Sequence, residues 1–418
     1  MIKKFHCENF RNVSCSDLEF ARINLLIGAN NGGKSNFIRA LSFAANMVSA
    51  YSDEPTGFLS ELKRNGWGGA VDRRQNDPHF RLIWDLELNK DLPVVYTLQA
   101  HTGPKREDNY ITEEALDSGE RIPGFSEPYH FFQCHSFRSG RGQFSTAGMS
   151  HTPNNLLMAD VSPLESVLLQ MDNLFFTNKE MFSTPFVRDN IRQVLDSMRH
   201  YFRGFYSYSC AAFHVAAIRE MQDEQTDGSA LKKDGSNFVN VMADVMESDP
   251  DFLNRYQDKL RRLISGFQDI QLPRAGGKLW MELKMNGCSF PLSELSDGTV
   301  HLLLLLLLLN LPQERGMSML AMDEPEMNLH PAWQKLMAHE ILRGESFKQC
   351  FISTHSPDFL DEFTQDFLEG HVNVIVFDPS SKKPLRQLDR NELRGELQNW
   401  TLGDLYRIGD PLIGGWPQ

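Results

Sequence analysis

Residues 28–35 read Gly-Ala-Asn-Asn-Gly-Gly-Lys-Ser, a spacing typical of a loop that wraps around phosphate groups. The glycines let the backbone turn tightly, so that amide groups face the phosphates. The apolar run at 23–27 predicts a strand before the loop, and the amphipathic segment after it predicts a helix whose positive end faces the same anion. We expect Lys34 to reach the β- and γ-phosphates and the Ser35 hydroxyl to bind Mg²⁺. The predicted nucleotide-binding residues of this loop are Gly28, Ala29, Asn30, Asn31, Gly32, Gly33, Lys34 and Ser35.

An apolar run at 317–322 ends in two carboxylates, Asp323 and Glu324. A buried strand delivers such a pair to the carboxyl edge of a parallel sheet, where ligands collect. We expect Asp323 to hold Mg²⁺ and Glu324 to orient the attacking water and accept its proton. Together with the phosphate loop, the pair predicts hydrolysis of ATP.

Residues 295–299 read Leu-Ser-Asp-Gly-Thr and stand before a run of leucines. A serine and a glycine at the start of a helix make a second anion-binding surface. This segment resembles the signature motif of ABC-type ATPases. Ser-Thr-His-Ser-Pro at 353–357 looks like the switch histidine of the same class, which makes His355 a candidate contact of the γ-phosphate.

The sequence motifs of this chain are similar to those of the branch containing RecF, Rad50, SMC proteins and the OLD ATPases. Asp-Glu-Pro-Glu at 323–326, Leu-His-Pro at 329–331 and Thr-His-Ser-Pro at 354–357 carry this resemblance. Transport ATPases have a fuller signature, from which Asp297 and Thr299 depart. Segments 231–241 and 298–331 also resemble stand-alone ATPases of the AAA-21 group, whereas residues 100–227 match no family pattern.

The resemblance implies a mechanism in which two ATP molecules are sandwiched between two heads. Ser296, Asp297 and Gly298 of one copy would then complete the site of another copy. Phe-Arg-Asn at 10–12 also resembles this branch, which implies that Arg11 approaches the nucleotide; a surface arginine in a hairpin turn is the alternative. A glutamine-bearing loop should link the two lobes, and Gln75, Gln133 and Gln143 are open alternatives.

The pattern of elements predicts an α/β fold with an inserted helical lobe. The resemblance implies a P-loop NTPase whose mixed-sheet lobe is similar to ABC and SMC heads. Residues 51–78 suggest a loop and 102–128 a surface excursion. From 300 onward, alternating helices and strands predict a parallel sheet covered on both faces. The expected domains are the N-terminal part of the ATPase lobe at 1–160, a helical lobe at 161–275, the C-terminal part of the ATPase lobe at 276–384, and a tail at 385–418 packed on that lobe.

The bulk composition favours a cytoplasmic protein. The chain has 418 residues and a net charge of -13, which argues against a surface that is basic throughout. Its six cysteines form no CxxC pair and suggest reduced thiols. The N-terminus lacks the apolar core of a signal peptide, and the leucine run at 302–309 is too short to span a membrane, so we expect a buried helix there.

The leading hypothesis for the biological role is an ATPase and sensor subunit of an anti-phage defence complex, similar to those of Septu and PARIS. Too few residues follow the strand at 372–377 for the nuclease module of the OLD family, so we expect a separately encoded effector such as a nuclease. A DNA repair or maintenance clamp is the alternative, for which basic and aromatic residues supply a nucleic-acid face: Arg188, Arg192, Arg199, Arg203, Phe202 and Phe205. An ATP-binding scaffold with negligible turnover is a further alternative.

Overall fold

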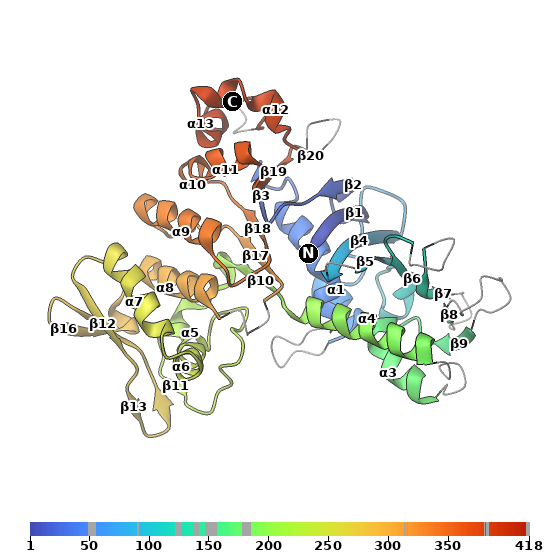
Figure 1. Cartoon of the computed structure of the whole chain (residues 1–418), viewed down its shortest axis with the longest axis horizontal. Coiled ribbons are helices and arrows are strands. Elements are labelled where there is room, and N and C mark those ends of the chain that lie inside the picture. The colour runs from blue at the N-terminus through green and yellow to red at the C-terminus, as the bar shows by residue number, and fades with distance from the viewer. Residues whose placement is uncertain are drawn as a thin grey trace.

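The computed structural model describes residues 1–48, 56–89, 92–121, 128–136, 142–146, 157–177, 185–312, 315, 317–379, 381 and 384–414. Two large sheets dominate these residues, one mostly parallel and one antiparallel, with helices between and beside them (Figure 1). The six cysteines form no disulfide, in agreement with the sequence. None of the helices in the described part of the chain combines the length and the apolarity needed to cross a bilayer.

The mostly parallel sheet carries the predicted chemistry. Its strands in spatial order are β10 (Phe205–Ser209), β17 (Met319–Asp323), β18 (Gln349–Ser353), β3 (Ile23–Gly28), β19 (Val372–Phe377) and β20 (Leu385–Gln387). The first five run parallel and β20 is antiparallel. Because β3, β18 and β19 are buried at every residue, their continuous apolar runs match strands covered on both faces. The alternating pattern of strands and helices is therefore confirmed.

The antiparallel sheet includes a hairpin of the first two strands and extends it. Its spatial order is β2 (Val13–Glu19), β1 (Ile2–Phe10), β4 (His79–Asn89), β5 (Leu92–His101), β6 (Tyr110–Ser118), β7 (His130–Ser136), β8 (Gly142–Thr146) and β9 (Leu157–Val161). The expected surface excursion at 102–128 is wrong, because β6 pairs with strands on both sides. Its Glu113-Glu114 pair hides the strand pattern, yet Glu114 is fully buried and bonded to Tyr96 and Ser166.

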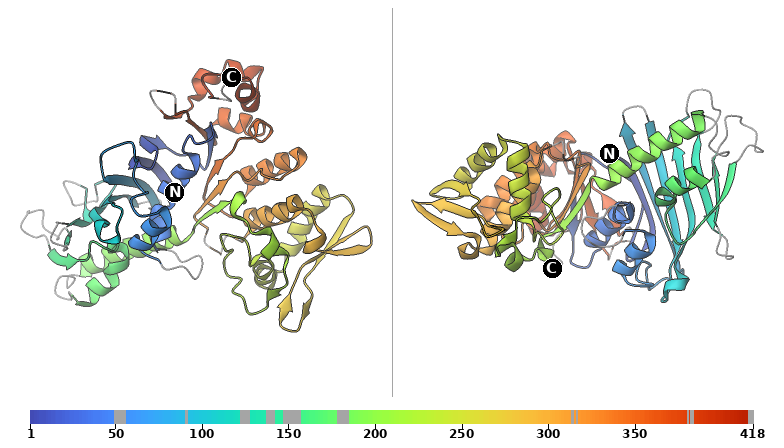
Figure 2. Two further views of the ribbon diagram at one scale, coloured as in Figure 1. Left: turned by 180° about the vertical axis from the view of Figure 1, so that it is seen from behind. Right: turned by 90° about the horizontal axis from the view of Figure 1, so that it is seen from below.

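Helices α1 (Lys34–Val48), α3 (Val167–Thr177) and α4 (Pro185–Arg203) pack with the antiparallel sheet in one apolar cluster. Figure 2 shows α4 running along this sheet. The short helix α2 (Phe58–Asn65) also belongs to the cluster, so the loop expected over 51–78 is wrong at these residues. Phe58 and Leu62, one turn apart, explain the helix because both side chains are buried against the cluster.

A second apolar cluster surrounds α8 (Asp297–Asn310), whose leucines at 302–309 are at most 2% exposed. The buried helix predicted there is confirmed. The same cluster includes residues of α5 (Val215–Arg219), α6 (Phe238–Ser248), α7 (Phe252–Leu263) and α9 (Pro331–Arg343). The lobe expected over 161–275 therefore divides between two clusters, with α3 and α4 in one and α6 and α7 in the other. Its definition as one domain stays a prediction.

Two small three-stranded sheets lie on the α8 side of the molecule. The first consists of β11 (Gln222–Asp223), β14 (Lys278–Leu279) and β13 (Arg274–Ala275), and the second of β12 (Phe267–Gln271), β15 (Glu282–Met285) and β16 (Cys288–Pro291). Short 3-10 turns are η1 (Arg106–Asp108), η3 (Cys210–Ala212), η4 (Leu292–Glu294) and η6 (Glu396–Gln398).

The C-terminal segment folds back onto the parallel sheet. It follows α10 (Pro357–Asp361) and α11 (Thr364–Glu369) and contains α12 (Arg390–Leu393) and α13 (Leu402–Arg407). Strand β20 pairs with β19, and Leu402 and Leu405 are buried in the same cluster as α8. The Tyr406 hydroxyl lies 3.4 Å from the carbonyl oxygen of Gly28.

Candidate nucleotide site

The phosphate loop begins where β3 ends and leads directly into α1. Gly28 has φ +128°, and a Cβ atom there would lie 2.1 Å from the carbonyl oxygen of Phe377 on β19, so a side chain has no room. Lys34 Nζ donates to the carbonyl oxygens of Gly28 at 3.0 Å and Ala29 at 3.1 Å. Burial lowers the pKa of Lys34 to about 8, against the opposing effect of the nearby carboxylates. The lysine side chain therefore lies folded back on the loop. A bound anion would stabilise its charged form.

The Ser35 hydroxyl meets the carboxylate of Asp323 at the carboxyl end of β17. Ser35 Oγ donates to Asp323 Oδ2 at 2.9 Å, and Ser353 Oγ donates to Oδ1 of the same carboxylate. Ser353 is the register partner of Asp323 on β18. A hydroxyl and a carboxylate are the hard oxygen donors that suit Mg²⁺. Ser35 and Asp323 are thus the residues that could hold the metal, which would supply positive charge to neutralise the phosphates when bound.

Glu324 follows in a left-handed backbone conformation, with φ +53°. Its N–H donates to the Ser353 carbonyl and hydroxyl oxygens, each at 3.1 Å, which hold this conformation. His355 Nε2 lies 3.6 Å from Glu324 Oε1. Burial and Lys34 lower the pKa of His355 to about 4, so the ring is neutral at pH 7 and the contact is no ion pair there. A neutral histidine beside a half-exposed carboxylate can contact a phosphate without neutralising the base.

Glu326 is a site residue whose position the sequence did not single out. Its Oε1 accepts the Thr354 hydroxyl at 2.7 Å and the His355 N–H at 2.9 Å, which fixes the backbone of the histidine. Its Oε2 is buried without a hydrogen bond, and burial raises the pKa of this carboxyl. Ser353 was likewise missed as a partner of Asp323. The available signal was that residues ending adjacent parallel strands meet at one sheet edge.

Arg11 lies near the site but bonds to protein atoms. Its backbone is left-handed at φ +52°, and its guanidinium donates to the carbonyl and side-chain oxygens of Asn65, both at 3.1 Å. Burial, Arg39 and Arg73 lower its pKa. Arg11 lines a cavity of about 500 Å³ together with Ser35 and Asp323. Its predicted contact with nucleotide stays a prediction.

The signature residues lie in another part of the molecule. Ser296 caps α8 by accepting the N–H of Thr299 at 3.2 Å. A Cβ atom at Gly298 would lie 2.5 Å from the carbonyl oxygen of Asn328, so the start of α8 packs closely on the segment after Glu326. Figures 1 and 2 draw α8 and α1 apart, with the parallel sheet between them. Among the described residues, Ser296, Asp297 and Gly298 contact Thr299, Arg219 and Asn328, respectively, and none of these contacts is with the phosphate loop.

The segment that leads from β10 toward α8 contains none of the expected glutamines. After β10 the chain crosses toward α8 through residues 210–214, Cys-Ala-Ala-Phe-His, which contain no glutamine, and the glutamine-bearing link stays a prediction. Gln75 instead lines a small cavity with Asn12 and Gly32, and Gln133 on β7 bonds to His130 at 3.0 Å. The side chain of Gln143 lies outside the described residues.

The aromatic residues of the predicted nucleic-acid face are buried, and two of its arginines contact neighbouring side chains. Arg199 pairs with Asp172 at 3.0 Å, and the Arg192 guanidinium lies 5.0 Å from the centre of the Phe175 ring. Phe202 and Phe205 are at most 1% exposed and belong to the core. The side chain of Arg188 lies outside the described residues, and Arg203 is exposed. The two rings predicted for the nucleic-acid face are therefore not available for stacking, whereas Arg192 and Arg203 are exposed.

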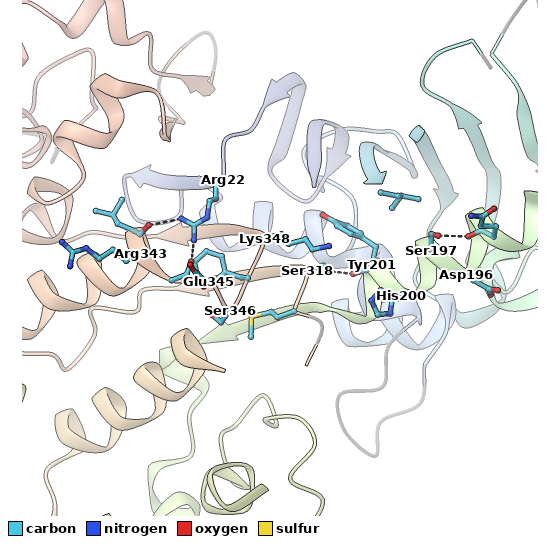
Figure 3. Close-up of a pocket in the computed structure, with 16 residues that line it drawn as sticks. Arg22, Asp196, Ser197, His200, Tyr201, Ser318, Arg343, Glu345, Ser346 and Lys348 are labelled. Atoms are coloured by element: carbon cyan, nitrogen blue, oxygen red, sulfur yellow. Dashed lines mark hydrogen bonds between the residues drawn. The ribbon is translucent and has the colours of Figure 1, made fainter. Parts of the chain in front are cut away.

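A larger cavity, about 1240 Å³, opens at the opposite edge of the parallel sheet (Figure 3). It is lined by residues that precede β3, β17 and β18, and by α4. Two of its polar side chains form hydrogen bonds to the main chain. Arg22 donates to the carbonyl oxygens of Leu342 and Gly344, and Ser318 donates to that of Tyr201. Ligands of open parallel sheets bind at the carboxyl ends of strands, so we place the candidate site there despite the smaller cavity.

Comparison with known proteins finds one family model and one curated relative that match part of the chain. Residues 188–361 match the family AAA_21, described as "AAA domain, putative AbiEii toxin, Type IV TA system". A curated protein of Escherichia coli named "Retron Ec83 probable ATPase" is 23% identical over 207 residues, or 46% of this chain. The family match covers less than half of the 418 residues of this chain. The match spans 36% of the retron protein, so it covers about a third of that relative's length.

Two solved SMC heads are similar over most of their length at 14% identity. An SMC head bound to the C-winged helix domain of ScpA has a TM-score of 0.49, with 94% of this chain and 99% of that chain covered. The SMC head domain from Thermotoga maritima has a TM-score of 0.41, with 92% and 97% covered.

Proposed function

We propose that this AAA-21-type chain binds ATP with Mg²⁺ and hydrolyses it slowly, as a switch that pairs two copies. The observation that carries the proposal is the 2.9 Å contact between Ser35 of the phosphate loop and Asp323 of the acidic pair. Two segments that are 288 positions apart in the chain thus present a hydroxyl, a carboxylate and the Lys34 ammonium to one point. That set suits a metal-bound triphosphate.

Glu324 is the proposed base for the attacking water. Its carboxylate is 38% exposed and stands beside the neutral His355, so it can accept a proton while the ring contacts the γ-phosphate. Glu324→Gln keeps the size of the side chain and removes the base. We expect turnover to fall about 100-fold or more while ATP binding persists, as measured by phosphate release and by binding of a fluorescent ATP analogue. Equal turnover in the two proteins would leave only an ATP-binding scaffold.

Pairing of two copies is the proposed role of the signature segment. Since the described contacts of Ser296 and Gly298 do not include their own phosphate loop, a second copy is the source proposed to complete each site. The Glu324→Gln protein should therefore form a dimer in ATP and Mg²⁺ and a monomer in ADP. Sedimentation velocity measures this directly. A monomer at all ATP concentrations would exclude the switch.

The proposed biological role is control of a separately encoded effector, such as a nuclease, in anti-phage defence. The support is the likeness to a protein named as a retron ATPase and to a family described with a toxin–antitoxin system. Co-expression with the product of the neighbouring gene, followed by affinity purification in ATP and in ADP, tests the role. A nucleotide-dependent complex supports it, whereas salt-sensitive binding of bare DNA with no protein partner would favour the repair clamp.

A further inference from the structure

Arg219 is the last residue of α5, and its guanidinium contacts the signature segment, residues 295–299. Its Nη2 lies 2.7 Å from Asp297 Oδ1 and donates to the carbonyl oxygen of Leu295 at 2.5 Å. Leu295 and Asp297 are the two chain neighbours of Ser296. One arginine thus holds both sides of the serine that is proposed to meet the phosphate of another copy.

Asp297 poses an electrostatic problem for that role. Its side chain is 61% exposed in the first turn of α8, where a triphosphate carrying several negative charges would have to approach. Like charges a few ångströms apart repel strongly at a partly dehydrated interface. Arg219 is the cation that neutralises this carboxylate. The sequence departs from the fuller signature at this position, and the structure places a compensating charge beside it.

The arginine is held rather than loosely exposed. Its side chain is 26% exposed, and its Nε is buried without a hydrogen bond. Arg219 also sits on the segment that leaves the catalytic edge of the sheet, since β10 ends at Ser209, the register partner of Asp323. Between them, the Phe213 ring packs against the ring of His301 on α8, with centroids 5.9 Å apart. The crossing segment therefore contacts the signature helix at two points.

We propose that Arg219 is a positioning residue that orients Ser296 and cancels the charge of Asp297, so that the signature of one copy can accept the γ-phosphate held by another. This inference rests on the proposed pairing of two copies. Arg219 touches no reacting atom of its own chain's site, so its removal should leave ATP binding to a single copy intact and weaken ATP-dependent association.

The test uses the full chain with Glu324→Gln, which accumulates the ATP-bound state. Sedimentation in ATP and Mg²⁺ measures the dimer dissociation constant, and a fluorescent ATP analogue at low protein concentration measures binding to the single copy. We expect Arg219→Ala to weaken dimerisation at least tenfold with the affinity for the analogue unchanged within twofold. Adding Asp297→Asn should restore most of the loss, and raising the salt concentration should narrow the difference between the Arg219→Ala protein and its parent.

Arg255→Ala is the matched control, because Arg255 pairs with Asp249 at 2.5 Å without involving a signature residue. Arg219→Lys keeps the charge and should keep part of the association. Unchanged dimerisation of the Arg219→Ala protein would overturn the inference and leave the proposed switch standing. A loss that neither Asp297→Asn nor Arg219→Lys relieves would overturn it too, because the arginine would then only hold the fold. A Glu324→Gln protein that never dimerises would overturn the switch and this inference together.

Discussion

The two edges of the parallel sheet are built from the same strands. They differ in how completely their polar groups are hydrogen-bonded to other protein atoms. The amino edge has the larger cavity, about 1240 Å³ against about 500 Å³, yet Arg22 and Ser318 there bond to main-chain carbonyls. The carboxyl edge combines the left-handed backbone of Glu324, the lowered pKa of Lys34 and the unbonded Oε2 of Glu326. Strained, buried and incompletely bonded groups are therefore our basis for placing the proposed site at the carboxyl edge, rather than cavity size.

The first prediction compares an aspartate at each edge. Asp323→Asn removes the charge of the proposed metal ligand, and we expect phosphate release to fall by roughly 100-fold or more. Asp196→Asn is the matched change in the larger cavity, where Asp196 is 72% exposed and lies 3.7 Å from Arg199. Its turnover should match the wild type. A comparable loss at both positions would mean that the two edges are not functionally distinct.

The second prediction compares two buried serines, Ser353 at the end of β18 and Ser318 just before the start of the neighbouring β17. Ser353→Ala deletes the donor that orients Asp323, and outer partners of metal ligands typically contribute 10- to 100-fold. We therefore expect turnover to fall about tenfold, with a higher Mg²⁺ concentration needed for half-maximal rate. Ser318→Ala deletes the bond to Tyr201 at the amino edge and should cost about 1 kcal/mol of stability without changing the Mg²⁺ requirement. A normal Mg²⁺ dependence in the Ser353→Ala protein would remove Ser353 from the site.

The phosphate loop and the acidic pair could be predicted from the sequence because each is a local pattern. The apolar run at 23–27 and the glycines after it define the strand, turn and helix without knowledge of the rest of the chain. The partners of these residues could not be predicted, since Ser353 meets Asp323 only through the register of β17 and β18. Likewise, Arg219 reaches Asp297 from a helix that is separated from it along the chain by two small sheets and two helices.

The antiparallel side was harder to predict for a different reason. Strand β6 carries Glu113 and Glu114 in its centre, and the sequence alone cannot show that Glu114 is buried and bonded to Tyr96, Ser166 and the N–H of Val167. Helices α3 and α4 have helical periodicity similar to that of α6 and α7, so they looked like one lobe. The packing partner of a helix is a tertiary property, and periodicity reports only that an apolar face exists.

The third prediction uses the pKa of Lys34, about 8 in the free protein. Bound phosphates favour the ammonium form, so the complex should hold the proton to a higher pH than the free protein does. ATP affinity should therefore be constant below pH 8 and fall above it, with a slope approaching about tenfold per pH unit. Titrations between pH 7.5 and 9.5 measure this, and Lys34→Arg, which stays charged, should bind with a flat profile. A flat profile in the wild type would show that the lysine is not desolvated.

The smallest expected effect is at the amino edge. Lys348 and Glu345 line the larger cavity and are exposed, so their truncation leaves no buried charge without a partner. Lys348→Ala and Glu345→Ala should each change ATP turnover less than about twofold and stability by less than about 0.5 kcal/mol. Phosphate release and thermal unfolding of the two proteins decide this. A clear loss of turnover in either protein would show that the amino edge is coupled to the nucleotide site. The two edges would then differ only in the part that each takes in the same ATPase cycle.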